Sequence, residues 1–171
     1  MKINRLFCVG MVGLFCFFSY LQLCSAELYV SKKGLFKIDV PQDWEWTDQL
    51  DSVIISNVEQ DSAIIIKMQS QSSAIASQEQ IEEVLGKGIE NIIEKVKLQK
   101  GIVVSEKSKS LDGSKAKQVN FLLTSDGGKA HASFVAVFAS GYLFTIYMEG
   151  PDEGARAKME KIINRIKFLG R

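Results

Sequence analysis

Alternating apolar and polar residues predict short strands in the first part of the chain. In residues 35–40 every second side chain is large and apolar, and Pro41 ends this segment because proline has no amide hydrogen for a sheet ladder. Residues 53–58 and 63–68 are β-branched runs separated by a short polar segment. Two such runs at this spacing are typical of an antiparallel hairpin.

The apolar period changes to three and four residues between Ile81 and Val96, which predicts an amphipathic helix. Ser77 and the glutamine three residues later fit a capping box at its start. Gly101 is expected to take the left-handed conformation that ends many helices. Gly88 lies within the apolar stripe, where a missing side chain would let the helix approach a sheet closely.

The period becomes two again after this helix. Tight-turn pairs such as Asp-Gly and Ser-Gly separate four extended runs, which predicts an antiparallel meander over residues 102–111, 116–124, 130–139 and 142–149. The last two runs are apolar at both parities, so we expect both of their faces to be covered. A closing helix is predicted after Pro151, with Phe168 packing back onto the core. This order of elements indicates an α+β sandwich.

The first 26 residues differ from the rest of the chain. Two positive charges precede an apolar run from Leu6 to Phe18, and small residues lie at −3 and −1 of a cleavage point after Ala26. This pattern predicts a signal peptide over residues 1–26 and an exported protein, periplasmic or extracellular. Two alternatives remain: an uncleaved leader that anchors the chain in a membrane, and a lipoprotein modified at Cys24, although leucine precedes that cysteine where a small residue is expected.

Composition describes residues 27–171 better once the leader is set aside. The whole chain has 171 residues, with 21 basic and 20 acidic side chains, and all three of its cysteines lie in the leader. The remainder is near neutral and has no disulfide partner and no thiolate chemistry. A chain of this length buries roughly two-thirds of its surface in one core, so we predict a single domain.

No pattern of catalytic residues is found in the sequence. The single histidine, His131, has no partner at metal-ligand spacing, and there is no Gly-x-Ser-x-Gly or phosphate-binding loop motif. We therefore expect no enzyme activity, no cofactor and no metal site.

Charge is distributed unevenly along the chain. Residues 39–61 carry seven acids and no base, whereas residues 95–117 carry seven lysines against two acids. Such separation can steer a partner or favour an anionic surface, and it can equally reflect two solvated faces. Nucleic acid is disfavoured because the domain is near neutral. The candidate basic surface consists of Lys107, Lys109, Lys115 and Lys117.

Two tryptophans form a second candidate surface. Trp44 follows Pro41 and is expected to cap the core, whereas Trp46 has the same parity and is expected to be more exposed. Indole rings are common in recognition surfaces, so a ligand shelf is the alternative to simple core packing.

Several segments resemble a known family. They are Phe36-x-Ile38-x-Val40-Pro41-x-Asp43-Trp44, Leu111-Asp112-Gly113-x-x-Ala116 and Gly141-Tyr142-Leu143-Phe144-Thr145-Ile146. Together with the two helices they resemble PsbP/Mog1-like domains, including bacterial DUF1795 and DcrB-type exported proteins, over essentially all of residues 27–171. The resemblance implies a three-layer α/β/α sandwich around a mostly antiparallel sheet of about seven strands. It also implies action by binding rather than by a shared reaction.

Three functional hypotheses follow. The first is an exported, non-catalytic binding or accessory protein of the cell envelope, whose partner is an envelope protein or a membrane-surface component. The alternative is a small-ligand or lipid-binding protein with a cleft near Trp44 and Trp46. The third is a hydrolase that uses His131.

Overall fold

The computed structural model describes residues 26–71, 77–125 and 128–170 of the chain. The predicted leader therefore lies outside the described residues, apart from Ala26. The elements, in chain order, are β1 (Ala26–Val30), β2 (Phe36–Pro41), β3 (Glu45–Asp48), β4 (Ser52–Asn57), β5 (Ser62–Ser70), α2 (Gln78–Leu98), β6 (Ile102–Leu111), β7 (Ser114–Ser125), β8 (Gly128–Ala139), β9 (Tyr142–Gly150), α3 (Glu153–Ile163) and β10 (Lys167–Phe168).

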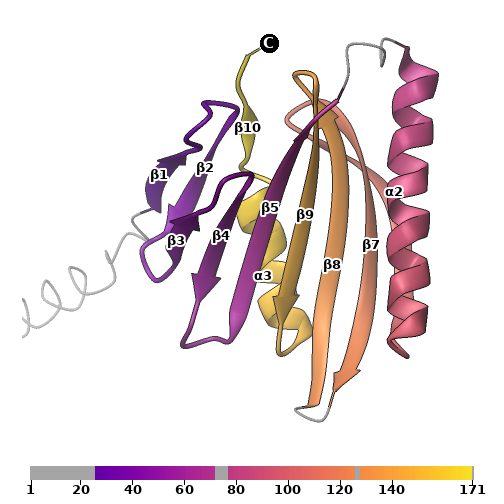
Figure 1. The fold of residues 1–171 in the computed structure, drawn as a ribbon. Helices are drawn as coiled ribbons and strands as arrows, with labels where there is room; N and C mark the ends of the chain where they lie inside the picture. Colours follow the sequence, from indigo (N-terminus) through magenta and orange to yellow (C-terminus); the bar gives the residue numbers. More distant parts are fainter. Residues whose placement is uncertain (1–25, 72–76, 126–127, 171) are drawn as a thin grey trace, which may run out of the picture.

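A seven-stranded sheet forms the centre of the molecule, with the order β3-β4-β5-β9-β8-β7-β6 and antiparallel pairing throughout (Figure 1). The pairing of Ile54 with Ile65 confirms the first predicted hairpin. The meander is also confirmed, and two of its turns have positive φ at both central residues, at Asp112-Gly113 and Ser140-Gly141. Two-residue hairpin turns of this kind match the right-handed twist of the strands.

A second, small sheet has the order β1-β2-β10. The segment that the alternation predicted as a strand is β2, and it ends at Pro41 as expected, but it pairs outside the central sheet. The alternation did not predict β1, β3 or β10. β10 has only two residues, and β1 buries only Tyr29, so neither strand carries a clear alternation.

The two helices cover opposite faces of the large sheet, which confirms the α+β three-layer sandwich (Figure 1). On one face Leu85, Ile89 and Val96 of α2 pack against β7 and β8. On the other face α3 and the small sheet close the larger core, and Phe168 packs on Phe144 with 4.7 Å between ring centroids. Neither described helix combines the length and apolar character that a bilayer crossing needs.

The sequence predicted the cap at the start of α2 correctly but not the residue that ends it. The Ser77 hydroxyl accepts from the Gln80 amide and the Gln80 side chain accepts from the Ser77 amide, which confirms the capping box. The expectation for Gly101 is wrong, because Lys100 takes the left-handed conformation with φ of 58°. Gly101 is instead a point of close approach, since a Cβ there would lie 2.7 Å from Val96 Cγ1.

The covering of β8 and β9 differs from the expectation. β8 is buried on both faces through Phe134 to Val137. β9 is buried on the α3 side, whereas Thr145 and Tyr147 on the α2 side are only half-buried. A helix about 10 Å wide covers only two or three strands spaced about 4.8 Å apart, and α2 packs mainly on β6, β7 and β8. Within the described residues, the α2 face of β4, β5 and β9 is therefore left open.

Candidate functional site

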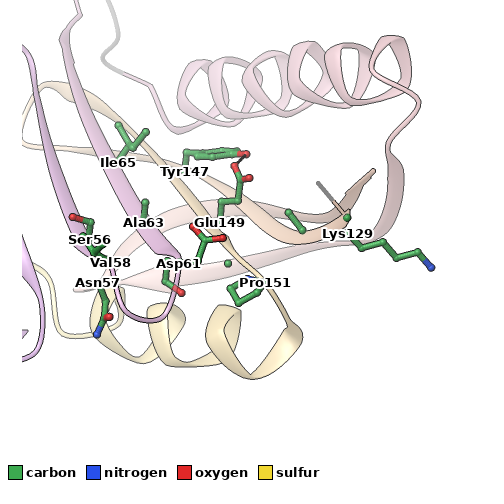
Figure 2. A pocket seen from close by; sticks show the side chains of 14 residues that line it. Ser56, Asn57, Val58, Asp61, Ala63, Ile65, Lys129, Tyr147, Glu149 and Pro151 are labelled. Atoms are coloured by element: carbon green, nitrogen blue, oxygen red, sulfur yellow. Dashed lines mark hydrogen bonds between the residues drawn. The ribbon is translucent and has the colours of Figure 1, made fainter. Parts of the chain in front are cut away.

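The open part of the sheet holds a cavity of about 570 Å³ (Figure 2). Its floor comes from neighbouring strands, because Ala63 and Ile65 of β5 pair with Glu149 and Tyr147 of β9. Ser56 of β4 pairs with Ala63 and continues the floor. All five side chains are half-buried and point to the side of the sheet that carries α2.

A second cavity of about 300 Å³ adjoins the first, since Ile65 and Tyr147 line both. It adds Ile92 of α2 and Phe134 of β8, so the space continues along the sheet to the flank of the helix. We call this combined space the open groove; Ala63, Ile65, Tyr147 and Glu149 form its floor and Ile92 one wall. It is a long, partly apolar surface rather than a closed chamber.

Tyr147 is the central aromatic side chain of the open groove. Its hydroxyl donates to the Glu149 carboxylate at 2.5 Å, and its ring lies 6.3 Å from the ring of Phe121. Burial, together with this bond, raises the pKa of Tyr147, so its phenol stays neutral. Lys129 lies at the rim (Figure 2). The open groove thus offers a partly apolar floor with two carboxylates, Asp61 and Glu149, and two lysines, Lys67 and Lys129.

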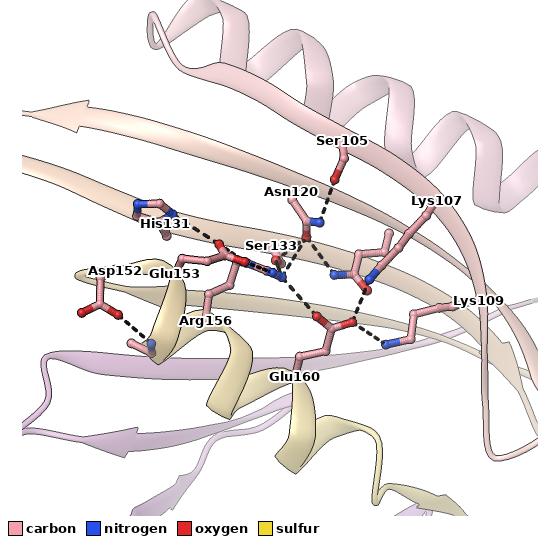
Figure 3. A network of polar contacts seen from close by, with 12 residues as sticks. Ser105, Lys107, Lys109, Asn120, His131, Ser133, Asp152, Glu153, Arg156 and Glu160 are labelled. Atoms are coloured by element: carbon pink, nitrogen blue, oxygen red, sulfur yellow. Dashed lines mark hydrogen bonds and ion pairs between the residues drawn. The ribbon is translucent and has the colours of Figure 1, made fainter.

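A network of polar side chains joins α3 to the sheet, on the face opposite to the open groove (Figure 3). Arg156 donates to the carboxylates of Glu153 and Glu160, and also to Asn120 and Ser133 at 3.3 Å. Asn120 in turn accepts from Ser133 and donates to Ser105. These bonds fix the helix on β7 and β8.

Glu160 is the acceptor at the centre of this network. Lys107 donates to it at 2.9 Å and Lys109 at 3.4 Å. Partial burial acts to raise the pKa of Glu160, but the hydrogen bond from Lys107 and the charges of both lysines outweigh it and lower the pKa to about 2. The carboxylate is therefore ionised across the physiological range.

His131 lies at one end of the network, with Nδ1 3.4 Å from the Glu153 carboxylate. The nearby hydroxyl of Ser133 donates to Asn120 rather than to the histidine. A base must lie within hydrogen-bond reach of the proton that it removes, and among the described residues these two side chains form no hydrogen bond with each other. Among the described residues no group of three His, Cys, Asp or Glu side chains could hold a metal ion.

The four lysines proposed as one basic surface lie on two faces. Lys107 and Lys109 lie on the α3 face and pair with Glu160. Lys115 lies on the α2 face, pairs with a glutamate of α2 at 2.9 Å and shares its face with Lys117. Successive residues of a strand point to opposite sides, and paired residues of neighbouring strands point to the same side. Because Lys109 pairs with Ala116 across the two-residue turn, Lys115 points to the other side of the sheet.

The two tryptophans are also separated. Trp44 is buried, with 5% of its surface exposed, and lines a cavity of about 250 Å³ beside α3. Trp46 is half-buried and packs on Tyr29, with 5.7 Å between ring centroids. The expectation that Trp44 caps the core is confirmed, but Trp46 is not among the residues that line the cavity beside Trp44.

Sequence reasoning missed the floor of the open groove. Tyr147 lies in a run that we expected to be covered on both faces, and Ile65 lies in a run predicted only as one strand of a hairpin. A usable signal was present, because seven strands at about 4.8 Å spacing are wider than the single helix available for that face.

The comparison with known families decides the classification. A family model described as PsbP matches residues 25–167. The chain belongs to the PsbP family. No curated protein sequence is similar enough to match it.

Solved structures share this PsbP fold at low sequence identity. Cyanobacterial PsbP (CyanoP) from Synechocystis sp. PCC 6803 is 12% identical, with a TM-score of 0.64 over 87% of this chain and 95% of that one. The Ran-binding protein Mog1p of Saccharomyces cerevisiae is 10% identical, with a TM-score of 0.55 over 84% and 95%. LpqN of Mycobacterium tuberculosis, involved in cell envelope biogenesis, is 11% identical, with a TM-score of 0.54 over 84% and 90%.

Membership of the PsbP family confirms the resemblance found in the sequence, and the structure shows why that resemblance carries the fold. Phe36, Ile38 and Val40 are at most 1% exposed, and Trp44 is 5% exposed. These side chains build the larger core of the PsbP fold. The floor of the open groove lies outside the segment that contains them.

Proposed function

We propose that this protein is an exported, non-catalytic accessory protein of the cell envelope that binds a partner protein through the open groove. The observation that carries the proposal is the half-buried floor of Ile65 and Tyr147 on a sheet face that α2 leaves open. Concave, partly apolar surfaces with a few placed polar groups are typical binding sites. Tyrosine is also enriched at the energetic centres of protein interfaces.

Two further observations support the proposal. The predicted leader favours export, and LpqN, which shares the fold, is described as involved in cell envelope biogenesis. Mog1p, also of this fold, is described as a Ran-binding protein, so binding to another protein is compatible with the architecture. The proposal of a non-catalytic role rests on the same family and on the polar network, whose side chains bond to one another.

A site-specific crosslinking experiment tests this function. A photoreactive phenylalanine analogue is placed at Ala63 in the groove floor and, as a control, at Leu50, which is 87% exposed and lies outside the groove. In intact envelopes the probe at Ala63 should give one crosslinked product whose amount saturates. Excess protein without the probe should compete this product away, and Ile65→Glu should reduce its yield. Equal products from both positions, or none from Ala63, would contradict the proposal.

The exported state has its own test. Cleavage after Ala26 predicts an intact mass corresponding to residues 27–171 for the protein recovered from cells. The mass of the whole chain would indicate a retained anchor, and an added lipid mass would place the cleavage before Cys24.

A further inference from the structure

A further cavity lies between Trp44 and α3, and none of its lining residues lines the open groove. It has a volume of about 250 Å³. Its apolar wall is made by Trp44 and Ile162, each 5% exposed. Lys158, Lys161 and Arg165 line it from the helix and from the turn that follows. Their spacing of three and four residues places these cations on one side of the helix.

The three cations have no carboxylate partner among the described residues. Lys158 donates to the amide oxygen of Gln60 at 3.2 Å, and no ion pair is formed by Lys161 or Arg165. Arg156, one turn earlier on the same helix, is by contrast bonded to two glutamates. On this helix, Arg156 therefore has carboxylate partners, whereas the three cations that line the cavity have none among the described residues.

One carboxylate, that of Asp43, also lines this cavity. It accepts from Asn57 at 2.9 Å and from Gln60 at 3.4 Å, so its hydrogen bonds hold it to the end of the β4–β5 hairpin. Three cations against one acid leave a net positive charge around an apolar wall. The helix dipole favours cations at this end of α3, but that effect does not require an apolar cavity beside them.

We propose that this cavity binds a phosphate monoester with an apolar body. The phosphate would be held by Lys161 and Arg165 with Lys158 beside them, and the apolar body would lie on Trp44 and Ile162. A phosphomonoester carries close to two negative charges at neutral pH, and an arginine fork binds its oxygens in pairs.

The volume limits what can enter. Pockets for drug-sized ligands begin at about 300 Å³, so this cavity suits the phosphate and a ring-sized apolar part, with any longer chain outside. A soluble ester and the headgroup of phosphatidic acid share this chemistry. The proposal goes beyond the proposed function, because its residues are on the α3 side of the sheet and none of them lines the open groove.

Fluorescence titration of the full chain tests the site. Trp46→Phe leaves Trp44 as the only tryptophan, and its emission should change saturably with phenyl phosphate. Inorganic phosphate and benzyl alcohol, which each supply one half of the ligand, should bind at least about tenfold more weakly. Calorimetric titration of the unsubstituted chain with phenyl phosphate gives the same constant without relying on the tryptophan variant.

Two paired variants separate this site from general charge effects. Lys161→Gln/Arg165→Gln should raise the Kd at least about tenfold, because two charge-assisted contacts are lost. Lys95→Gln/Lys97→Gln removes the same charge from the end of α2 and should leave the Kd unchanged.

Vesicles distinguish the two sources of the ligand. A lipid headgroup would be supported if the protein sediments with phosphatidylcholine vesicles that contain phosphatidic acid and if Lys161→Gln/Arg165→Gln abolishes this binding. Saturable binding of phenyl phosphate without vesicle binding would support a soluble ester. The proposal is overturned if neither probe binds saturably, if inorganic phosphate binds as tightly as phenyl phosphate, or if the α2 control loses as much affinity.

Discussion

Lys107 Nζ on the edge strand β6 lies 2.9 Å from Glu160 Oε1 on α3, and this ion pair joins residues 53 positions apart. The carboxylate side chain is only 17% exposed, and Arg156 donates to its other oxygen at 3.1 Å. Lys109 approaches the first oxygen at 3.4 Å. One carboxylate therefore contacts three cations that the fold brings together, and Arg156 also pairs with Glu153.

Replacing Glu160 by glutamine should lower the stability of the protein. Lys107 and Lys109 would then lose their carboxylate and Arg156 would keep only Glu153, so we expect a loss of about 1–3 kcal/mol in the free energy of unfolding. Urea denaturation measures the loss. Glu83→Gln is the matched control, because Glu83 forms an exposed pair with Lys87 within α2 and its loss should change the free energy of unfolding clearly less. Equal losses in the two variants would show that the network has no special role.

The pKa of Glu160 predicts a dependence of stability on acid. It is about 2 in the folded protein, below its ordinary value of 4.5. Folding therefore favours the ionised form, so the stabilisation is complete above the unfolded value and is lost as the pH falls toward 2. Urea midpoints measured from about pH 6 to about pH 2.5 should fall less steeply for Glu160→Gln than for the original chain. Parallel curves would contradict the prediction.

The sequence predicted the helices, the two hairpins and the layer order because each rests on a local pattern. Ser77 begins α2 through a cap that involves only four consecutive residues. Asp112 and Gly113 form a turn whose conformation depends on those two residues. The runs that are apolar on both faces predicted the covering of the sheet on both sides, and the family resemblance implied the same three layers.

The candidate sites depend on which distant segments meet, and this was beyond the local patterns. Lys107 and Lys109 belong to the same basic stretch as Lys115, but the two-residue turn puts the first pair on α3 and the third on α2. In the same way, Trp44 was a candidate from its residue type, whereas its proximity to Arg165 follows from the packing of α3.

Two isoleucines of α2 that look equivalent in the apolar stripe should differ in their contribution to stability. Ile89 is 1% exposed, whereas Ile92 is half-buried and lines the open groove. Ile89→Ala should cost about 2–5 kcal/mol through lost burial and a cavity, and Ile92→Ala clearly less. Urea denaturation of the two variants checks this order. If Ile92→Ala lowered the free energy of unfolding as much as Ile89→Ala does, Ile92 would be fully buried in solution and the groove would be closed at this wall.

Gly150 should not tolerate a side chain. A Cβ at this position would lie 2.8 Å from Ala155 Cβ, 3.1 Å from Ser62 Oγ and 3.2 Å from Met159 Cε. Ala155 belongs to the first turn of α3, so the clash would push the helix away from the end of β9. Gly150→Ala should lower the free energy of unfolding by about 1–3 kcal/mol, measured by urea denaturation. A variant as stable as the original chain would show that α3 can shift without cost.

Gly88 should behave in the opposite way, contrary to the expectation that its missing side chain permits a close approach to the sheet. A Cβ there would lie 4.0 Å from Ala136 Cβ, which is an ordinary van der Waals contact. Alanine also restricts the unfolded chain and favours the helix. Gly88→Ala should therefore raise the free energy of unfolding by about 0.5–1 kcal/mol in the same measurement. A lower free energy of unfolding for this variant would contradict the prediction. It would mean that α2 packs closer to β8 than these distances indicate.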